Sequence, residues 1–232
     1  MMGPSSEDDL DLRGFDGVCR LFPLPDVVQF PHSILPLHIF EPRYRQMTED
    51  ALAGDGLVTV VRVPMPAEMM PDGRAVIEPV ACLGRILQHE RLPDGRFNFL
   101  LLGRKRVRLL REIPSEKLYR IAEAEILEDL EPDAAMDPGQ IKASLVGLFR
   151  VAISKGRGLD PDLERLLAAD LPLGVAVDMM AHALRLSPAT KQSFLAEPLV
   201  EERADRLLRR LQEFAGVDPV GLKPFPPDFS VN

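Results

Sequence analysis

The stretch of residues 21–52 constrains the fold most, because short apolar runs and proline-marked turns give way there to a helical pattern. The apolar runs predict one strand over Val18–Leu24 and a second over Ile34–Phe40. Glu41 and Pro42 then end the second strand and open a helix, since proline at the first helical position loses no hydrogen bond. The sequence therefore predicts a strand, a tight turn, a strand and a helix in succession.

The predicted helix has one apolar stripe, formed by Tyr44, Met47, Ala51 and Leu52. Gly54 follows where a left-handed C-cap is commonly found, so we expect the helix to end there.

The next part of the chain keeps the two-residue period of strands. Four further strands are expected: Leu57–Val63, Val80–Arg91, Phe97–Arg111 and Tyr119–Leu127. Leu92–Gly95 is a turn sequence that makes the middle pair a long hairpin. Gly103 interrupts the long strand, as at a bulge or a barrel corner. Several strands with one early helix favour a small mixed barrel or pseudo-barrel.

The stretch Pro64–Arg74 holds three prolines and should be a surface loop. Its methionines, Met65, Met69 and Met70, suit an adaptable binding surface. They also suit a loop that folds back onto the barrel, which we expect in preference.

From Asp137 the apolar period changes from two to 3.6, and four residue pairs look like a cap followed by proline at a helix start. These pairs are Asp137–Pro138, Asp160–Pro161, Ser187–Pro188 and Glu197–Pro198. The helices they open are amphipathic, and Gly156 and Gly216 end the first and the last of them. Amphipathic helices must pack on one another or on the barrel, so a helical bundle is expected.

Composition places the chain among ordinary soluble globular proteins. Its 232 residues are 46% hydrophobic and 28% charged, which allows one large domain or two lobes. No apolar run is long enough to span a membrane, and the acidic N-terminus is unlike a signal peptide, so we expect a cytoplasmic protein. The net charge of −8 works against nucleic-acid binding.

The residue types used by metal sites are few. The two cysteines lie in apolar strand patterns, so we expect free buried thiols rather than a disulfide. The four histidines lack matching Cys, Asp or Glu spacing, so we expect no metal site and no cofactor.

Known catalytic motifs are missing from the sequence. It contains no G-x-x-x-x-G-K-[ST], no G-x-S-x-G and no H-E-x-x-H. Ser154 and Lys155 are neighbours on a predicted helix, where their side chains diverge by about 100° and cannot form a dyad. We therefore expect no catalytic residue.

Two segments carry a resemblance to a known family. LFPLPDVVQFPHSILPLHIFEPRYRQM, and later VACLGRILQHERLPDGRFNFLLLGRKRVRLL, resemble the N-terminal substrate-binding domain of Lon proteases. The resemblance covers about residues 18–214 and is closest to stand-alone bacterial proteins that lack the ATPase and protease domains. It implies an α+β fold, with an N-terminal PUA-like mixed β-barrel lobe followed by a C-terminal helical bundle.

The expected organisation follows from these patterns. We expect an acidic tail (1–16), the barrel lobe (17–128), a linker (129–137), the bundle (138–215) and a proline-rich tail (216–232). The last segment either lies along the body or stays loose.

The candidate binding residues are of two kinds. An apolar set comes from the first segment, together with the arginine of its EPRYR motif: Phe30, Pro31, Leu35, Phe40, Arg43 and Tyr44. A basic set, Arg104, Arg106 and Arg108, alternates along one strand and could form a cationic ridge. Each set also has a plain structural interpretation, as core packing for the first and as partners of Glu123 and Glu125 for the second.

The resemblance implies substrate selection in proteolysis. We expect a non-catalytic module that recognises peptide or unfolded protein segments, as an adaptor or holdase. A protease or chaperone partner and a homodimer are both left open. A small-molecule or RNA-binding PUA-like module is the alternative, and an independent hydrolase is the third and weakest.

Overall fold

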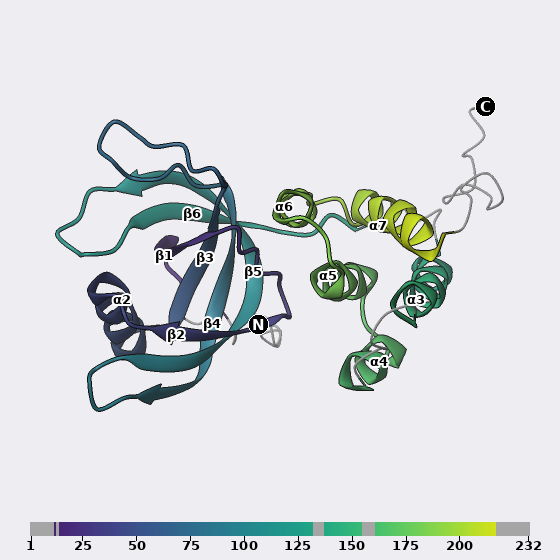
Figure 1. Ribbon diagram of the computed structural model, residues 1–232, viewed down its shortest axis with the longest axis horizontal. Helices are drawn as coiled ribbons and strands as arrows, with labels where there is room; N and C mark the ends of the chain where they lie inside the picture. The colour runs from purple at the N-terminus through teal and green to yellow at the C-terminus, as the bar shows by residue number, and fades with distance from the viewer. Residues whose placement is uncertain (1–11, 13, 132–136, 155–160, 217–232) are drawn as a thin grey trace, which may run out of the picture. The chain divides into compact units, whose positions relative to one another are not determined.

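A computed structural model of the chain describes residue 12 and residues 14–131, 137–154 and 161–216. They belong to two compact units (Figure 1). The sheet unit combines Met1–Glu128 with Leu186–Ala196, and the helical unit combines Asp129–Arg185 with Glu197–Asn232. Together they make a mixed α+β fold, which confirms the predicted class.

The sheet unit contains a six-stranded sheet and the helices α2 and α6. The strands are β1 (Val18–Pro25), β2 (Ile34–Ile39), β3 (Leu57–Val63), β4 (Val80–Arg91), β5 (Phe97–Ile113) and β6 (Ile121–Leu127). Helix α2 spans Pro42–Ala53 and α6 spans Pro188–Leu195. The predicted strand–turn–strand–helix order is therefore confirmed.

The strand order is β2-β5-β4-β3-β1-β6, and β6 also pairs with β5. Five of the strands thus follow one another in a closed circuit, with β2 added on the outside of β5. The β1–β3 pair is parallel and the other pairs are antiparallel. Two parallel strands need a long connection, because the chain must travel back to the end at which the first strand began. The segment that contains α2 provides this connection between β1 and β3.

The long strand β5 pairs with two strands along the same edge. Its first part pairs with β2 and its second part with β6. Gly103 lies between these parts, next to a shift in the register between β4 and β5. A Cβ atom at Gly103 would lie 2.1 Å from the carbonyl oxygen of Phe30, so glycine is required by a close backbone approach. The predicted irregularity at Gly103 is confirmed.

Helix α2 buries Tyr44, Met47, Thr48 and Ala51 against the sheet. Around it lies a core cluster that includes residues of β1, β2, β3 and β5: Phe22, Ile39, Val58, Val60, Phe97, Phe99 and Leu101. The expected left-handed cap at Gly54 is wrong, because φ there is −117°. Gly56 has the positive φ of +73° instead, and its amide donates to the carbonyl of Ala51 over 2.8 Å.

The helical unit contains α3 (Pro138–Ser154), α4 (Pro161–Ala168), α5 (Leu173–Ala183) and α7 (Val200–Ala215). Helices α3, α5 and α7 pack on one another. Arg203 is completely buried among them, and its guanidinium bonds to Asp178 over 2.6 Å and to Asp129 over 2.5 Å. A buried cation needs such partners, since an unpaired one would cost several kcal/mol.

Four of the predicted boundaries of the later helices can be compared with the structure. Asp137 and Ser187 accept backbone hydrogen bonds at the starts of α3 and α6, as predicted. Gly216 ends α7 with a φ of 66°. The predicted start of α7 at Pro198 is wrong, because the carbonyl of Pro198 accepts from the Leu130 amide and the helix begins two residues later.

Helix α6 belongs to the sheet unit although its neighbours in sequence do not. The Gln192 side chain donates to the carbonyl of Val80 over 2.8 Å, and the Arg106 side chain donates to the carbonyl of Leu195 over 2.9 Å. The end of β5 that carries Arg106 is thereby covered by α6.

Some expectations fall outside the described residues. These are most of the acidic tail, the middle of the linker, the Asp160 cap, the Gly156 stop, Lys155 and the proline-rich tail. Cys19 and Cys82 are free and buried, as predicted. None of the described helices combines the length and the apolar character needed to cross a membrane.

Candidate functional site

A groove with a volume of about 610 Å³ opens in the sheet unit. This volume falls within the range of small-ligand and peptide sites. Its walls come from the end of β1, the end of β2, the start of α2 and the segment between β3 and β4. The lining residues used below are Phe22, Pro23, Phe40, Arg43, Tyr44, Met65, Met69, Arg74 and Arg120.

The floor of the groove is fixed by Tyr44, of which 5% is exposed. Its ring meets the edge of the Phe22 ring at 4.5 Å between centroids, and its hydroxyl lies 3.5 Å from the carbonyl oxygen of Pro23. Burial raises the pKa of the Tyr44 hydroxyl, so this group remains a neutral donor. The Arg43 guanidinium stacks over the same ring at 4.5 Å. The start of α2 is thereby locked to β1.

The rim of the groove is apolar and exposed. Phe40 is 60% exposed, Met65 53% and Met69 58%. Phe40 and Met65 directly follow strands β2 and β3, with one proline between Val63 and Met65, so both stand on ordered elements. Exposed apolar side chains on a rigid floor are typical of a surface that binds another molecule.

The segment from Pro64 to Ala75 is held in place by polar contacts at its far end. Met69 and Ala75 form an isolated bridge, and the Arg120 guanidinium donates to the carbonyl of Ala75 over 2.8 Å. Glu112 pairs with Arg120 and, at 2.5 Å, with Arg74. The bond from Arg120, helped by the Arg74 charge, lowers the pKa of Glu112 despite the opposing effect of burial. This acidic link anchors one wall of the groove.

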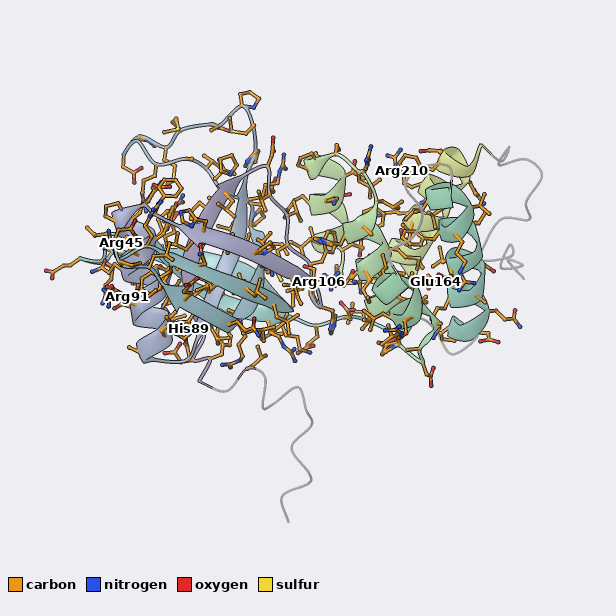
Figure 2. All side chains as sticks on the ribbon, turned by 60° about the horizontal axis from the view of Figure 1, so that its bottom comes forward. Arg45, His89, Arg91, Arg106, Glu164 and Arg210 are labelled. Atoms are coloured by element: carbon orange, nitrogen blue, oxygen red, sulfur yellow. The ribbon has the colours of Figure 1, made fainter. Side chains whose placement is uncertain are left out.

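A second, shallower hollow of about 480 Å³ lies over β2, β5 and β4. It is lined by Pro36, Leu100 and His89, among others, and His89 is labelled in Figure 2. His38 borders both hollows, so strand β2 separates them. None of the residues that line it is among the exposed large apolar side chains of the described structure, whereas Phe40, Met65 and Met69 of the groove are.

The structure brings together three candidates of the first set, which combined apolar residues with Arg43. Phe40, Arg43 and Tyr44 all line the groove, although only the first two are exposed. Leu35 is half-buried against the core below. Phe30 and Pro31 are buried and do not line the groove, because their turn packs against Gly103.

The basic candidates do not form the expected cationic ridge. Arg106 is 3% exposed and lies beneath α6, whereas Arg108 is exposed and faces Glu125 at 3.8 Å. Arg104 is half-buried at the register shift. Arg106, labelled in Figure 2, therefore joins α6 to the sheet and offers little surface to a ligand.

Sequence reasoning missed part of the groove. Met65 and Met69 were weighed as a binding surface, but the folded-back alternative was preferred, and their exposure now favours the surface. The sequence did not indicate that Arg74 and Arg120 line the groove. Their link through Glu112 joins residues that are not neighbours in sequence. Pro23 and Pro25 of β1 also carry a signal, discussed below, that sequence reasoning did not use.

Two kinds of chemistry find no support among the described residues. They contain no group of three or more His, Cys, Asp or Glu side chains that could hold a metal ion. Burial, the largest influence, raises the pKa of Cys19 to about 11, so this thiol is a poor nucleophile at neutral pH.

Comparison with known proteins shows which family the chain resembles. Residues 18–213 match the family described as the ATP-dependent protease La (LON) substrate-binding domain. The chain is 28% identical over 210 residues to a Lon protease of Xanthomonas oryzae pv. oryzae, covering 89% of this chain and 23% of that protein. It is 25% identical over 191 residues to a Lon protease of Rhizobium meliloti, covering 81% and 23%. The chain thus spans less than a quarter of the length of these relatives.

Two solved structures share the fold. A Lon N-terminal domain protein from Xanthomonas campestris superposes with a TM-score of 0.59 at 22% identity, covering 83% of this chain and 97% of that one. The N-terminal domain of a Mycobacterium avium complex Lon protease gives 0.61 at 15% identity, covering 86% and 98%. These two likenesses concern the fold alone.

Proposed function

The chain belongs to the family of LON substrate-binding domains, and from this premise we propose that its groove binds peptide or unfolded protein segments. The observation that carries the proposal is the exposed apolar rim on a fixed floor. Phe40, Met65 and Met69 are each more than half exposed around the buried Tyr44. An unfolded segment exposes apolar side chains that a folded protein buries. The apolar rim should therefore bind unfolded segments in preference to folded proteins.

The proposed activity is binding without cleavage, as an adaptor or holdase. The sequence contains none of the nucleotide-binding or hydrolase motifs sought above. An adaptor would deliver the bound segment to a protease or chaperone, whereas a holdase would act alone or as a homodimer.

We also infer the finer architecture that the family resemblance implies. The closed circuit of five strands supports a PUA-like barrel, and the packing of α3, α5 and α7 supports a helical bundle.

The binding test uses reduced, carboxymethylated α-lactalbumin, which cannot refold, with a fluorescent label and anisotropy as the readout. Replacing both Phe40 and Met69 by alanine should raise the Kd about tenfold or more, because burying one large apolar side chain is worth roughly 1.5–3 kcal/mol.

The matched control is Leu110→Ala. Leu110 is 56% exposed, like the rim residues, but does not line the groove. Its replacement should leave the Kd unchanged. Equal effects of the control and the double variant, or no binding by the wild-type protein, would contradict the proposal.

A further inference from the structure

Two strand edges flank the groove, and both lack a neighbouring strand there. β2 ends the strand order and pairs only with β5. β1 pairs with β6 only through Val18–Arg20, so its second half has β3 on one side and the groove on the other. Unpaired edges present backbone donors and acceptors that another extended chain can use.

The backbone groups of β2 that point away from β5 can be assigned from the ladder. The Gly103 amide donates to the carbonyl of Ser33 over 2.9 Å, so Ser33 faces β5. In an antiparallel ladder the facing alternates, so the backbone groups of Ile34, Pro36 and His38 point away from β5. Among the described strands β2 pairs with β5 alone, so no strand lies on the side toward which the Ile34 and His38 amides point. The β2 edge therefore offers two N–H donors and three carbonyl acceptors that β5 does not use. Those of His38 lie in the groove, and Pro36 lies beside the neighbouring shallow hollow.

The opposite edge differs because of its prolines. The Leu21 amide donates to the carbonyl of Arg120 over 2.9 Å, so residues two and four positions later face the same way. These are Pro23 and Pro25, which have no N–H group. The β1 edge beside the groove thus lacks donors, and a strand cannot form a regular ladder with it.

The charges around the groove are balanced. Each of the three guanidinium groups in the lining pairs with a carboxylate: Arg43 with Glu41, Arg74 with Asp72 and Glu112, and Arg120 with Glu112. The lining therefore favours neither an acidic nor a basic ligand, and recognition falls to the strand edge and the apolar rim.

We propose that the bound segment is an extended chain that adds to the edge of β2 as a further strand, with apolar side chains at alternate positions on the rim. This inference rests on the proposed function and specifies how the groove is used. The ladder supplies affinity that is independent of sequence, and the alternate side chains supply selectivity.

The first test uses a synthetic twelve-residue peptide of alternating phenylalanine and threonine with an aspartate at each end. In an added strand, only every second residue directs its N–H group toward β2. Backbone N-methylation of one alternate set should therefore weaken binding at least tenfold, and methylation of the other set less than threefold. Equal effects of the two sets would overturn strand addition.

The second test changes the edge itself. His38→Pro removes one donor and should weaken binding about fivefold, whereas His38→Ala removes the side chain, keeps the donor and should change it less than twofold. Pro36→Ala adds a donor and should tighten binding severalfold, a gain that misfolding cannot produce. Failure of Pro36→Ala to tighten binding, with His38→Pro and His38→Ala equal, would overturn the inference.

A charge control replaces both aspartates of the peptide by lysine. Because the guanidinium groups of the groove are paired with carboxylates, this change should alter the Kd less than threefold. A change of tenfold or more would contradict recognition through the strand edge and the apolar rim. If the aspartate peptide binds and depends on Phe40 but shows no methylation pattern, strand addition fails while the proposed function stands. If neither this peptide nor unfolded α-lactalbumin binds, the proposed function itself fails.

Discussion

Arg106 and Arg108 lie two residues apart on β5, on the same face by alternation, and have opposite surroundings. Arg106 is buried beneath α6, where its Nε donates to the carbonyl of Leu195. Arg108 is exposed and only loosely paired with Glu125. Because the covering residue follows 89 positions later in the chain, a local pattern of alternating arginines cannot separate the two roles.

We expect Arg106→Ala to lower the free energy of unfolding by about 2–3 kcal/mol, since it removes packing and leaves a buried carbonyl without a donor. Arg108→Ala should change it by less than about 0.5 kcal/mol, as is usual for an exposed ion pair. Urea denaturation of both variants measures the difference. Equal losses would show that α6 does not bury Arg106 in solution.

The residues of the groove were only partly predictable, for physical reasons. Phe40, Arg43 and Tyr44 lie on consecutive elements, so a local pattern places them together. The opposite wall comes from the Met65–Met69 segment and from Arg120, which are brought there by tertiary folding alone. Phe30 looked equally suitable in sequence but is fully buried, because apolar character does not reveal which face of a turn is covered.

At the scale of elements, strand β5 depends on a glycine. Gly103→Ala should cost about 3 kcal/mol or more, since the new Cβ would overlap the Phe30 carbonyl, and no flexible side chain can move aside. The matched control is Gly147→Ala in α3, where an added Cβ meets nothing within 4 Å. That change should instead stabilise by roughly 0.5–1 kcal/mol, because alanine favours a helix. Thermal unfolding followed by circular dichroism distinguishes the two, and a tolerated Gly103→Ala would contradict the described register.

The wall segment after β3 should respond to acid through Glu112. The pKa of this carboxyl is lowered from 4.5 in the folded state, so ionisation stabilises the fold. Its contribution is complete above about pH 4.5 and is lost as the pH falls through the lowered folded-state value. The difference in Tm between the wild type and Glu112→Gln should therefore be largest at pH 5 and above, and should shrink toward pH 3. A difference that grows on acidification would contradict the Arg120–Glu112 link.

Element boundaries were predicted well wherever a local cause sets them. The ends of β3 and β4 and the caps of α3 and α6 were predicted from alternation, turn residues and capping side chains. The errors at Gly54 and Pro198 have different origins. Near Gly54 two glycines are available for the left-handed position, and Gly56 takes it while its amide bonds back to Ala51. At Pro198 a contact distant in sequence, the Leu130–Leu199 bridge, replaces the favoured local structure.

At the scale of the whole chain, the path crosses between two units more than once. After α5 it returns to the sheet unit for α6 and then re-enters the helical unit for α7. Amphipathic periods predict that each helix is covered, but they do not identify the partner. The fold class was therefore predictable, while the placement of α6 on the sheet was not.

The central claim is that unfolded segments bind in the groove of the sheet unit. Hydrogen exchange of the whole chain, with and without reduced, carboxymethylated α-lactalbumin, tests it most directly. We predict added protection in the peptides that contain Leu37–Phe40 and Met65–Ala75, and none in α3 or α7. Protection confined to the helical unit, or no change anywhere in the presence of saturating ligand, would contradict the claim.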